Sequence, residues 1–122
     1  MARQEKRQPE RFLETGEKYY FGDGAEQDYA EAVKWFLKAA ELGDDWAECY
    51  LGEIYSRGRG VRQDCAEAAK WYRKAAGKGN AHAQTNLGVM CVQGLGMKKN
   101  IAEGVEWLRK AAEQGEPDAC AD

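Results

Sequence analysis

The fold is decided by the stretch Trp71-Tyr72-Arg73-Lys74-Ala75-Ala76-Gly77-Lys78-Gly79, because the chain contains its pattern three times. The pattern W-x-x-K-A-A-x-x-G also spans residues 35–43 and 107–115, and each copy lies 36 residues from the next. Further glycines and an alanine–glutamate pair keep the same spacing, with no gap anywhere. A fixed period of about 20–50 residues is the signature of a stacked repeat array. We therefore expect most residues to have a structural role.

Composition places the chain among globular proteins of one domain. Its 122 residues are 43% hydrophobic and 11% aromatic, which is enough for a core. A charged fraction of 32% leaves no apolar run long enough to cross a membrane, so we expect no membrane insertion. Residues 1–10 carry charge but no apolar segment of a signal peptide. The expected compartment is the cytoplasm, unless a leader was removed from a longer precursor.

Charge is divided unevenly along the array. Residues 13–48 carry ten acidic and three basic side chains, whereas residues 49–84 carry three acidic and seven basic ones. Nucleic-acid binding needs a basic stripe that continues along the surface, and the acidic neighbour argues against it. The division suggests instead a partner of complementary charge polarity, whose binding weakens at high salt.

The cysteines do not predict a metal site or a disulfide framework. They show no C-x-x-C pair and no paired spacing that recurs with the repeat: Cys49, Cys65, Cys91 and Cys120. Cys91 takes the position of Tyr19 and Tyr55 in the other repeats, so we expect a small buried hydrophobic side chain there. We expect neither a metal nor a cofactor.

The first helix of each unit, which we call helix A, begins after Asp44 or Asn80, two residues that favour the N-cap position. Apolar residues between 47 and 55 recur at three- and four-residue intervals, which gives the helix one apolar face. The glycines of Gly58-Arg59-Gly60 adopt positive φ readily and are expected to end it. Each unit is therefore predicted to open with a short amphipathic helix.

The second helix, helix B, begins at an apparent capping box. Asp64-x-x-Glu67 and its two counterparts predict that the first side chain accepts from the backbone while the glutamate reaches back to the N-cap N–H. Gly79 and its counterparts follow the last turn as C′ residues. Alanines on one face allow a neighbouring helix to approach closely, and Trp71 and Tyr72 supply bulk.

Two such helices bury too little alone, so the hairpins are expected to stack. The predicted fold is all-α, a right-handed α-solenoid of three 36-residue helix-turn-helix repeats plus the start of a fourth. The domain comprises residues 12–122 after a charged lead-in, residues 1–11; its units are 12–44, 45–80 and 81–116, and a stub, 117–122. The stub indicates a truncated array, a packing partner or an open end.

The middle unit carries L-G-x-x-Y at 51–55, G-x-G-V at 58–61 and W-Y-x-K-A-A at 71–76. In these motifs it resembles the Sel-one-like repeat, a branch of the tetratricopeptide-like superfamily, and the resemblance covers nearly everything from Phe12 to Asp122. The third unit departs from the pattern with Cys91, Gly104 and Leu108, which we expect to loosen packing locally. Paired cysteines, which tie the two helices together in a secreted branch of this family, are missing.

The resemblance implies an α-solenoid that binds proteins or peptides and performs no chemistry itself. Members act as adaptors in bacterial signalling, envelope and exopolysaccharide control, host interaction and eukaryotic membrane-associated degradation, and fold resemblance does not choose among these. An alternative is a structural module that self-associates through its uncapped C-terminal end.

Helix A lines the concave surface in such arrays, so the candidate contact residues flank the Leu-Gly pair of each unit. They are Leu13, Glu17, Tyr20 and Phe21; Trp46, Cys49, Glu53, Ser56 and Arg57; and His82, Thr85, Val89, Val92 and Gln93. These positions vary between units, as a recognition surface requires, although drift on a solvated face looks identical. Trp46 is the sharpest candidate because tryptophan is enriched in binding hot spots, yet it could instead pack against the first unit.

No catalytic constellation is visible. The repeated G-x-G lacks a preceding strand and a following G-K-[ST], so it predicts a turn and not a phosphate loop. His82 is the only histidine and is interpreted as a surface residue. Glu67 recurs in every unit, which fits capping and not an acid–base pair confined to one pocket. We expect a protein that is not an enzyme.

Overall fold

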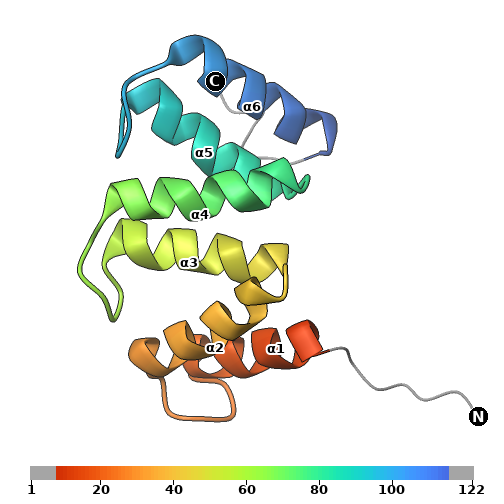
Figure 1. Ribbon diagram of the computed structural model, residues 1–122, viewed down its shortest axis with the longest axis vertical. Coiled ribbons are helices and arrows are strands. Elements are labelled where there is room, and N and C mark those ends of the chain that lie inside the picture. The colour runs from red at the N-terminus through yellow and green to blue at the C-terminus, as the bar shows by residue number, and fades with distance from the viewer. Residues whose placement is uncertain (1–7, 116–122) are drawn as a thin grey trace, which may run out of the picture.

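The computed structural model describes residues 8–115 and shows three pairs of antiparallel helices stacked along one axis (Figure 1). The pairs are α1 (Gln8–Phe21) with α2 (Tyr29–Glu41), α3 (Asp45–Arg57) with α4 (Cys65–Gly77), and α5 (Ala81–Gln93) with α6 (Ile101–Glu113). No strand occurs in this described range. The predicted all-α helical repeat fold is confirmed, while the predicted stub at 117–122 lies outside the described residues.

Helices α2 to α6 begin at the predicted N-caps, whereas α1 begins at Gln8, inside the stretch predicted as a lead-in. Asp64 Oδ1 accepts from the backbone N–H of Glu67 at 3.0 Å, and α2 and α6 begin in the same way. The reach-back half of the capping box is wrong, because the Asp64 N–H donates to the Tyr55 carbonyl of the preceding helix at 2.9 Å. The capping-box glutamate makes a different contact in α6, where Glu103 Oε2 accepts from Trp107 Nε1 at 3.1 Å.

The recurring W-x-x-K-A-A string provides two kinds of contact in each B helix. Lys74 Nζ lies 4.7 Å from the Trp71 ring centroid, and its counterparts lie 4.4 and 4.8 Å from theirs, within the range of a cation–π contact. Next to the lysine in sequence, Ala75 is fully buried, as are its counterparts Ala39 and Ala111. The lysine therefore covers the indole while the alanine lets the neighbouring helix approach.

One glycine of each A helix, Gly16, Gly52 or Gly88, receives a bulky side chain from its B helix. A Cβ on Gly52 would lie 2.7 Å from the Tyr72 ring. In the third pair, a Cβ on Gly88 would meet both Leu108, at 2.8 Å, and the Gly104 carbonyl oxygen, at 2.9 Å. The expected loosening there is wrong, because Gly104 lets the two backbones come close enough for the smaller leucine to fill the contact.

Adjacent pairs interlock through the loop between helices A and B. Gly60 has φ +74°, and a Cβ there would lie 2.6 Å from Tyr29 Cβ and 2.9 Å from Ala30 N, at the start of the preceding B helix. Gly96 meets the backbone of Cys65 and Ala66 in the same way. The second glycine of G-x-G thus serves both the turn and the stacking of units.

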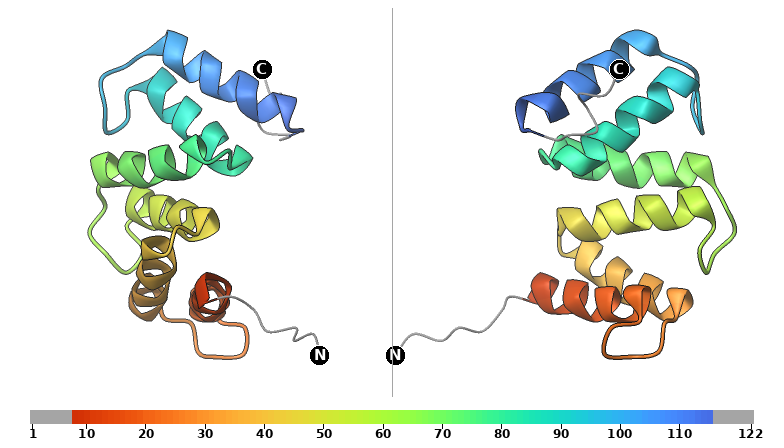
Figure 2. Two further views of the ribbon diagram at one scale, coloured as in Figure 1. Left: turned by 45° about the vertical axis from the view of Figure 1, so that its right-hand side comes forward. Right: turned by 180° about the vertical axis from the view of Figure 1, so that it is seen from behind.

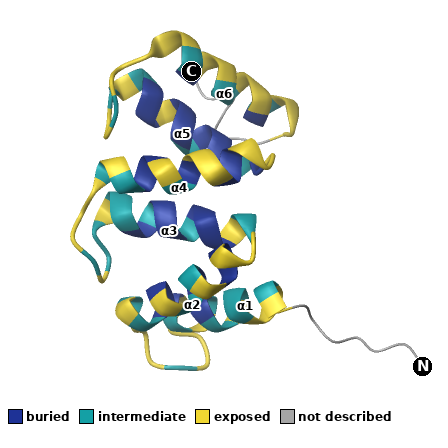
Figure 3. Ribbon diagram, in the orientation of Figure 1, coloured by how far each residue is buried: buried dark blue, intermediate teal, exposed yellow. Residues whose placement is uncertain are grey.

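The core consists of two clusters of buried residues, one formed by α1, α2 and α3 and the other by α3, α4 and α5, within the stack of helices (Figures 2 and 3). Phe36, Leu51 and Ile54 are fully buried in one cluster, and Leu87 and Cys91 in the other. Cys91 is the small buried residue that the sequence predicts, and burial raises the pKa of its thiol. A thiol in this state is a packing group and a poor nucleophile.

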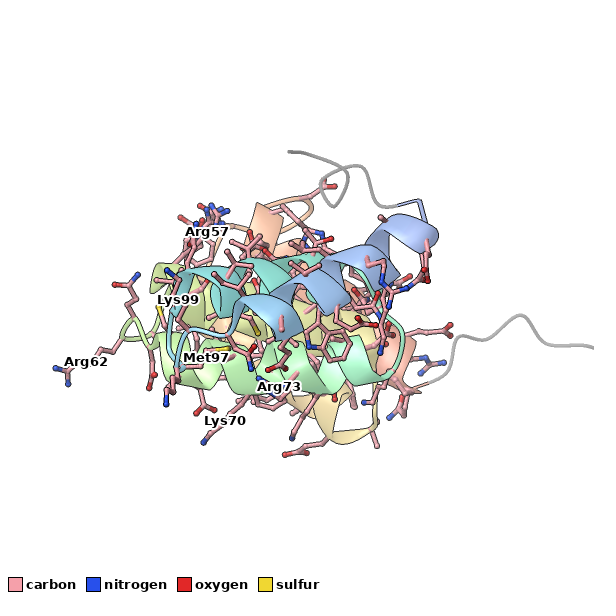
Figure 4. All side chains as sticks on the ribbon, turned by 90° about the horizontal axis from the view of Figure 1, so that it is seen from above. Arg57, Arg62, Lys70, Arg73, Met97 and Lys99 are labelled. Atoms are coloured by element: carbon pink, nitrogen blue, oxygen red, sulfur yellow. The ribbon has the colours of Figure 1, made fainter. Side chains whose placement is uncertain are left out.

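An exposed ion pair joins the second and third pairs. Arg73 Nη1 contacts Glu103 Oε2 at 2.6 Å, and Arg73 also reaches the Met97 sulfur, its neighbour in the view from above (Figure 4). The hydrogen bond from Arg73, followed by that from Trp107, holds the pKa of the Glu103 carboxyl below its usual value. The pair therefore contributes stability above the unfolded-state pKa of about 4.3, and loses it as pH falls through the lower folded-state pKa.

We expect Arg73→Gln to raise the pKa of the Glu103 carboxyl, because the substitution removes the main group that stabilises its charge. The stability cost at neutral pH should be only about 0.2–1 kcal/mol, since both side chains are partly exposed. A pH titration of the Glu103 side-chain carbon signal by NMR measures the shift. An unchanged pKa in the variant would show that the contact does not form in solution.

Candidate functional site

A pocket of about 220 Å³ opens on the surface of the A helices, and we call it the Trp46 pocket. It is lined by Trp46, Cys49, Tyr50, Glu53 and His82. The first four belong to α3 and the last to α5, so two adjacent repeats build it together. Helix periodicity explains the α3 set, because positions three or four apart share one face.

Trp46 and His82 occupy equivalent positions of adjacent repeats, each two residues after an N-cap. Their ring centroids lie 6.0 Å apart with the planes tilted by 32°. Trp46 is 49% exposed and His82 is half-buried. Two neighbouring A helices thus present an aromatic pair to the solvent at their N-terminal ends.

Tyr50 forms a rigid part of the pocket wall. Its ring stacks on Phe36 with centroids 4.5 Å apart, and its hydroxyl donates to Glu17 Oε2 at 2.8 Å. Burial, followed by this hydrogen bond, raises the pKa of the Tyr50 phenol above its usual value. The phenol therefore stays protonated at neutral pH and remains a donor to Glu17.

Glu53 supplies the formal negative charge among the lining side chains. Its carboxylate lies 3.6 Å from the Arg57 guanidinium, one turn later on the exposed side of α3. Cys49 is buried beneath the pocket, and its thiol donates weakly to Asn80 Oδ1 at 3.8 Å. The pocket therefore combines aromatic faces with one carboxylate.

A second hollow, which we call the acidic depression, lies on α1 and the loop after it. Its volume is about 340 Å³, and it is lined by Glu14, Glu17, Lys18, Phe21 and Asp23. Three carboxylates face one ammonium group, and Phe21 is 59% exposed. Glu17 belongs to this depression and accepts the hydrogen bond from Tyr50, so the two hollows are adjacent.

Several predicted contact residues come together in these hollows. The Trp46 pocket unites Trp46, Cys49, Glu53 and His82, and the acidic depression contains Glu17 and Phe21. Ser56 and Val89 line a third hollow of about 340 Å³ between α3 and α5. Arg57 and Gln93 are exposed, and Leu13 is partly buried against the first core cluster.

Other predicted contact residues belong to the interior, which corrects the sequence prediction. Tyr20 is 3% exposed and Thr85 is 7% exposed, so neither presents its side chain to a partner. Tyr20 is held among aromatic rings and accepts a 2.8 Å hydrogen bond from Arg59, which belongs to the next repeat. Val92 lies against Gly104 of α6, within its own helix pair. Tyr20 is therefore covered by the next repeat, whereas Val92 packs within its own.

Sequence reasoning missed Tyr50 as a site residue, because it assigned this residue to the apolar face of α3. A signal was present in the equivalent positions, which hold Glu14 and Asn86. A tyrosine whose counterparts are polar is not required by the shared core. Tyr50 lies half-buried beside the pocket, which explains why this position differs from those of Glu14 and Asn86.

The described part of the chain, residues 8–115, contains no group of three or more His, Cys, Asp or Glu residues arranged to hold a metal ion. Its three cysteines, Cys49, Cys65 and Cys91, are free thiols. None of its helices combines the length and the apolar character that a membrane span needs. The arrangement at the Trp46 pocket is suited to binding through aromatic and carboxylate groups.

Comparison with solved structures finds the same architecture. A crystal structure of c5321, a protective antigen of uropathogenic Escherichia coli with an SLR fold, is 47% identical and superposes with a TM-score of 0.87. A Sel1 repeat protein from Oxalobacter formigenes is 40% identical, with a TM-score of 0.88. Helicobacter pylori cysteine rich protein B, at 24% identity and a TM-score of 0.75, shares the fold.

These similarities differ in how much of each protein they span. They cover 91%, 91% and 92% of this chain, but 24%, 46% and 92% of the three structures respectively. No curated protein matches the chain. The sequence model of the Sel1 repeat matches residues 14–44, 47–80 and 81–116, which together account for most of the chain. The repeated hairpins, their glycine contacts and these matches agree: the chain belongs to the Sel1 repeat family.

Proposed function

We propose that the chain is a non-catalytic scaffold that binds a protein or peptide on the surface of its A helices, α1, α3 and α5. The observation that carries the proposal is the aromatic pair of exposed Trp46 and half-buried His82, which two repeats build together beside a carboxylate. Sel1 repeat proteins generally act as scaffolds for protein–protein interaction, which supports the same assignment.

The exposed aromatic side chains are not needed by the fold. Trp46 has Glu10 and His82 at its equivalent positions, and Phe21, 59% exposed, has Arg57 and Gln93 at its own. All three helices form with these different residues, so the shared framework does not select them. Large aromatic groups that remain exposed are typical anchors of protein interfaces.

Selection from a random peptide library tests the proposal. We expect selected peptides to bind the wild-type chain and to lose more than about fivefold in affinity with Trp46→Ala or Phe21→Ala, since hot-spot truncation costs over about 1 kcal/mol. Leu42→Ala is the matched control, because Leu42 is 52% exposed at the end of a B helix. Peptides that bind all four proteins equally, or a library that yields no binder, would overturn the proposal.

A second candidate is self-association through α6. Val105 is 53% exposed, whereas its counterparts Val33 and Ala69, each covered by the next A helix, are 8% and 6% exposed. Ile101, one turn earlier on α6, is 54% exposed. The described chain therefore presents at α6 the apolar face that it buries twice elsewhere, and an unpaired face of this kind favours association.

The opposite end of the array does not match this face. Where α3 packs on α2 it offers Ala47, Leu51 and Ile54, but the equivalent residues of α1 are Arg11, Thr15 and Lys18. Head-to-tail stacking of two copies would bury these polar groups without designed partners, which is unfavourable. Self-association would therefore join α6 to α6 about a two-fold axis.

If this second candidate is correct, the mass measured by light scattering will rise with protein concentration. Val105→Glu should keep the chain monomeric, because it places a charge at the centre of the joined surface. Arg11→Glu at the opposite end is the control and should leave the rise unchanged. A wild-type mass that stays monomeric at every concentration excludes this function.

A further inference from the structure

We infer that the Trp46 pocket takes a cationic side chain, preferably arginine, from a basic segment of the partner. This inference rests on the proposed function and names the partner chemistry that the same site would select. It depends on the groups that line the pocket, on the carboxylate already engaged by a guanidinium there, and on the acidic depression beside it.

The lining groups are those that attract a cation. The faces of aromatic rings carry negative potential, and tryptophan attracts cations most strongly. Trp46 presents a half-exposed indole at the pocket, and Glu53 places a carboxylate in the same wall. An aliphatic side chain would instead displace water from Glu53 and bring no charge of its own in exchange, and an anion would be repelled by it.

Glu53 is already in contact with a guanidinium of its own chain. Its partner Arg57 is 59% exposed and lies 3.6 Å away, and such surface pairs contribute little to stability. An arginine entering the pocket would exchange with Arg57, or share the carboxylate with it, at low energetic cost. The pair shows both that a guanidinium can reach Glu53 and which internal group competes for it.

Arginine suits the pocket better than lysine. Its planar guanidinium stacks on an aromatic ring and presents a fork of donors to a carboxylate, whereas lysine offers a compact, strongly hydrated charge. The pocket volume of about 220 Å³ corresponds to several water molecules at about 30 Å³ each. It therefore has room for the planar guanidinium and part of the aliphatic chain of arginine. Trp46 and Glu53 together offer the stacking face and the acceptor.

The acidic depression extends the same preference along the surface. Glu14, Glu17 and Asp23 line it against a single lysine, and Glu17 reaches Tyr50 of the Trp46 pocket with a 2.8 Å hydrogen bond. A second basic residue of the partner segment would therefore meet carboxylates there. The charges of both hollows favour a basic partner over an acidic one.

The test uses the acetylated, amidated tripeptide Gly-Arg-Gly as the probe and NMR as the readout. His82 is the only histidine, so its imidazole signals report on the pocket without ambiguity. We expect saturable shifts of the His82 and Trp46 ring signals on titration. The same tripeptide with citrulline, which keeps the shape of arginine but has no charge, should bind at least about tenfold more weakly.

Substitutions of pocket residues test whether the arginine probe binds in the pocket or only near it. Trp46→Ala should weaken binding of the arginine probe by about threefold to thirtyfold, the range of a cation–π contact. Glu53→Gln should weaken it as well, whereas Arg57→Gln should strengthen it by removing the internal competitor. Glu106→Gln, at a carboxylate on α6 that is 52% exposed, is the charge-matched control and should change nothing. Unchanged circular dichroism verifies that each variant is folded.

Equal binding of the arginine and citrulline probes, absence of any saturable shift, or no effect of Glu53→Gln would overturn the inference. A lysine probe that binds more tightly than arginine would overturn the stated preference. If library peptides depend on Trp46 but contain no basic residue, the scaffold function stands and the cation inference falls. If the probe binds but no library peptide uses this surface, the scaffold function fails and the cation pocket remains.

Discussion

Replacing Lys78 with alanine will lower the free energy of unfolding by about 3 kcal/mol, because it leaves the carboxylate of Glu48 buried without its cation. Glu48 has a side chain only 3% exposed, and Lys78 Nζ contacts its Oε2 at 2.7 Å. Lys78 also donates to the Gly43 carbonyl at 3.1 Å, which closes the open end of the second helix pair. Urea unfolding followed by far-ultraviolet circular dichroism measures the loss.

Lys70→Ala provides the matched control on the same helix. Lys70 is 73% exposed and pairs with a partly exposed Glu67 at 3.6 Å, so its removal should cost under about 0.5 kcal/mol. Equal effects of the two alanine substitutions would contradict the role given to Glu48.

The third helix pair suggests a double substitution that should restore the stability lost in the Lys78 variant. There, Gln114 Nε2 donates to Gln84 Oε1 at 2.9 Å and to the Gly79 carbonyl at 2.9 Å, at positions equivalent to Lys78, Glu48 and Gly43. Combining Glu48→Gln with Lys78→Gln should therefore recover most of the stability lost in Lys78→Ala, because a neutral amide pair needs no buried charge. A double variant as unstable as Lys78→Ala would show that the two contacts are not equivalent.

Gly60→Ala is expected to destabilise the chain by about 2–4 kcal/mol. Part of this cost, about 1 kcal/mol, is backbone strain, since Gly60 has φ +74°. The rest, about 1–3 kcal/mol, arises because the added Cβ would lie 2.6 Å from Tyr29 Cβ and 2.9 Å from Ala30 N, and backbone atoms yield little. Urea unfolding gives the total.

Gly24→Ala measures the cost of backbone strain without the steric clash of an added Cβ. Gly24 occupies the equivalent position with φ +90°, but a Cβ there would meet only the flexible Lys18 side chain, at 3.6 Å. It should therefore show the strain alone, and the difference between the two variants measures the contact between adjacent repeats. A difference near zero would mean that the repeats separate enough to admit a methyl group at little cost.

The sequence was sufficient to predict the helix pairs and the ends of α2 to α6, but not the start of α1 at Gln8. Asp64 caps its helix and the glycines of G-x-G adopt positive φ, because these effects depend on residues within one turn. The role of the capping-box glutamate was mispredicted, because it depends on a residue further away than one turn. The Asp64 N–H, which was expected to donate to Glu67, donates instead to the Tyr55 carbonyl of the preceding helix, a contact that no local rule anticipates.

The candidate site was predicted only in part. Spacing identified Trp46 and Glu53, because residues on one helix face stay neighbours in any packing, and the 36-residue period identified His82 as the counterpart of Trp46. The burial of Tyr20 and the contribution of Tyr50 depended on contacts between α1 and the following repeat. One repeat alone does not contain that information.

The sequence by itself determined that this chain folds as repeated helical hairpins, since the 36-residue period, the caps and the glycines each act through local geometry or steric limits. Only the tertiary structure decided which side chains remain on the surface and how those of different repeats meet. Trp46 meets His82, and Glu17 meets Tyr50, across a gap between neighbouring helices. The physical reason is that exposure and contact depend on the angle at which one hairpin packs on the next, and that angle results from many side chains together.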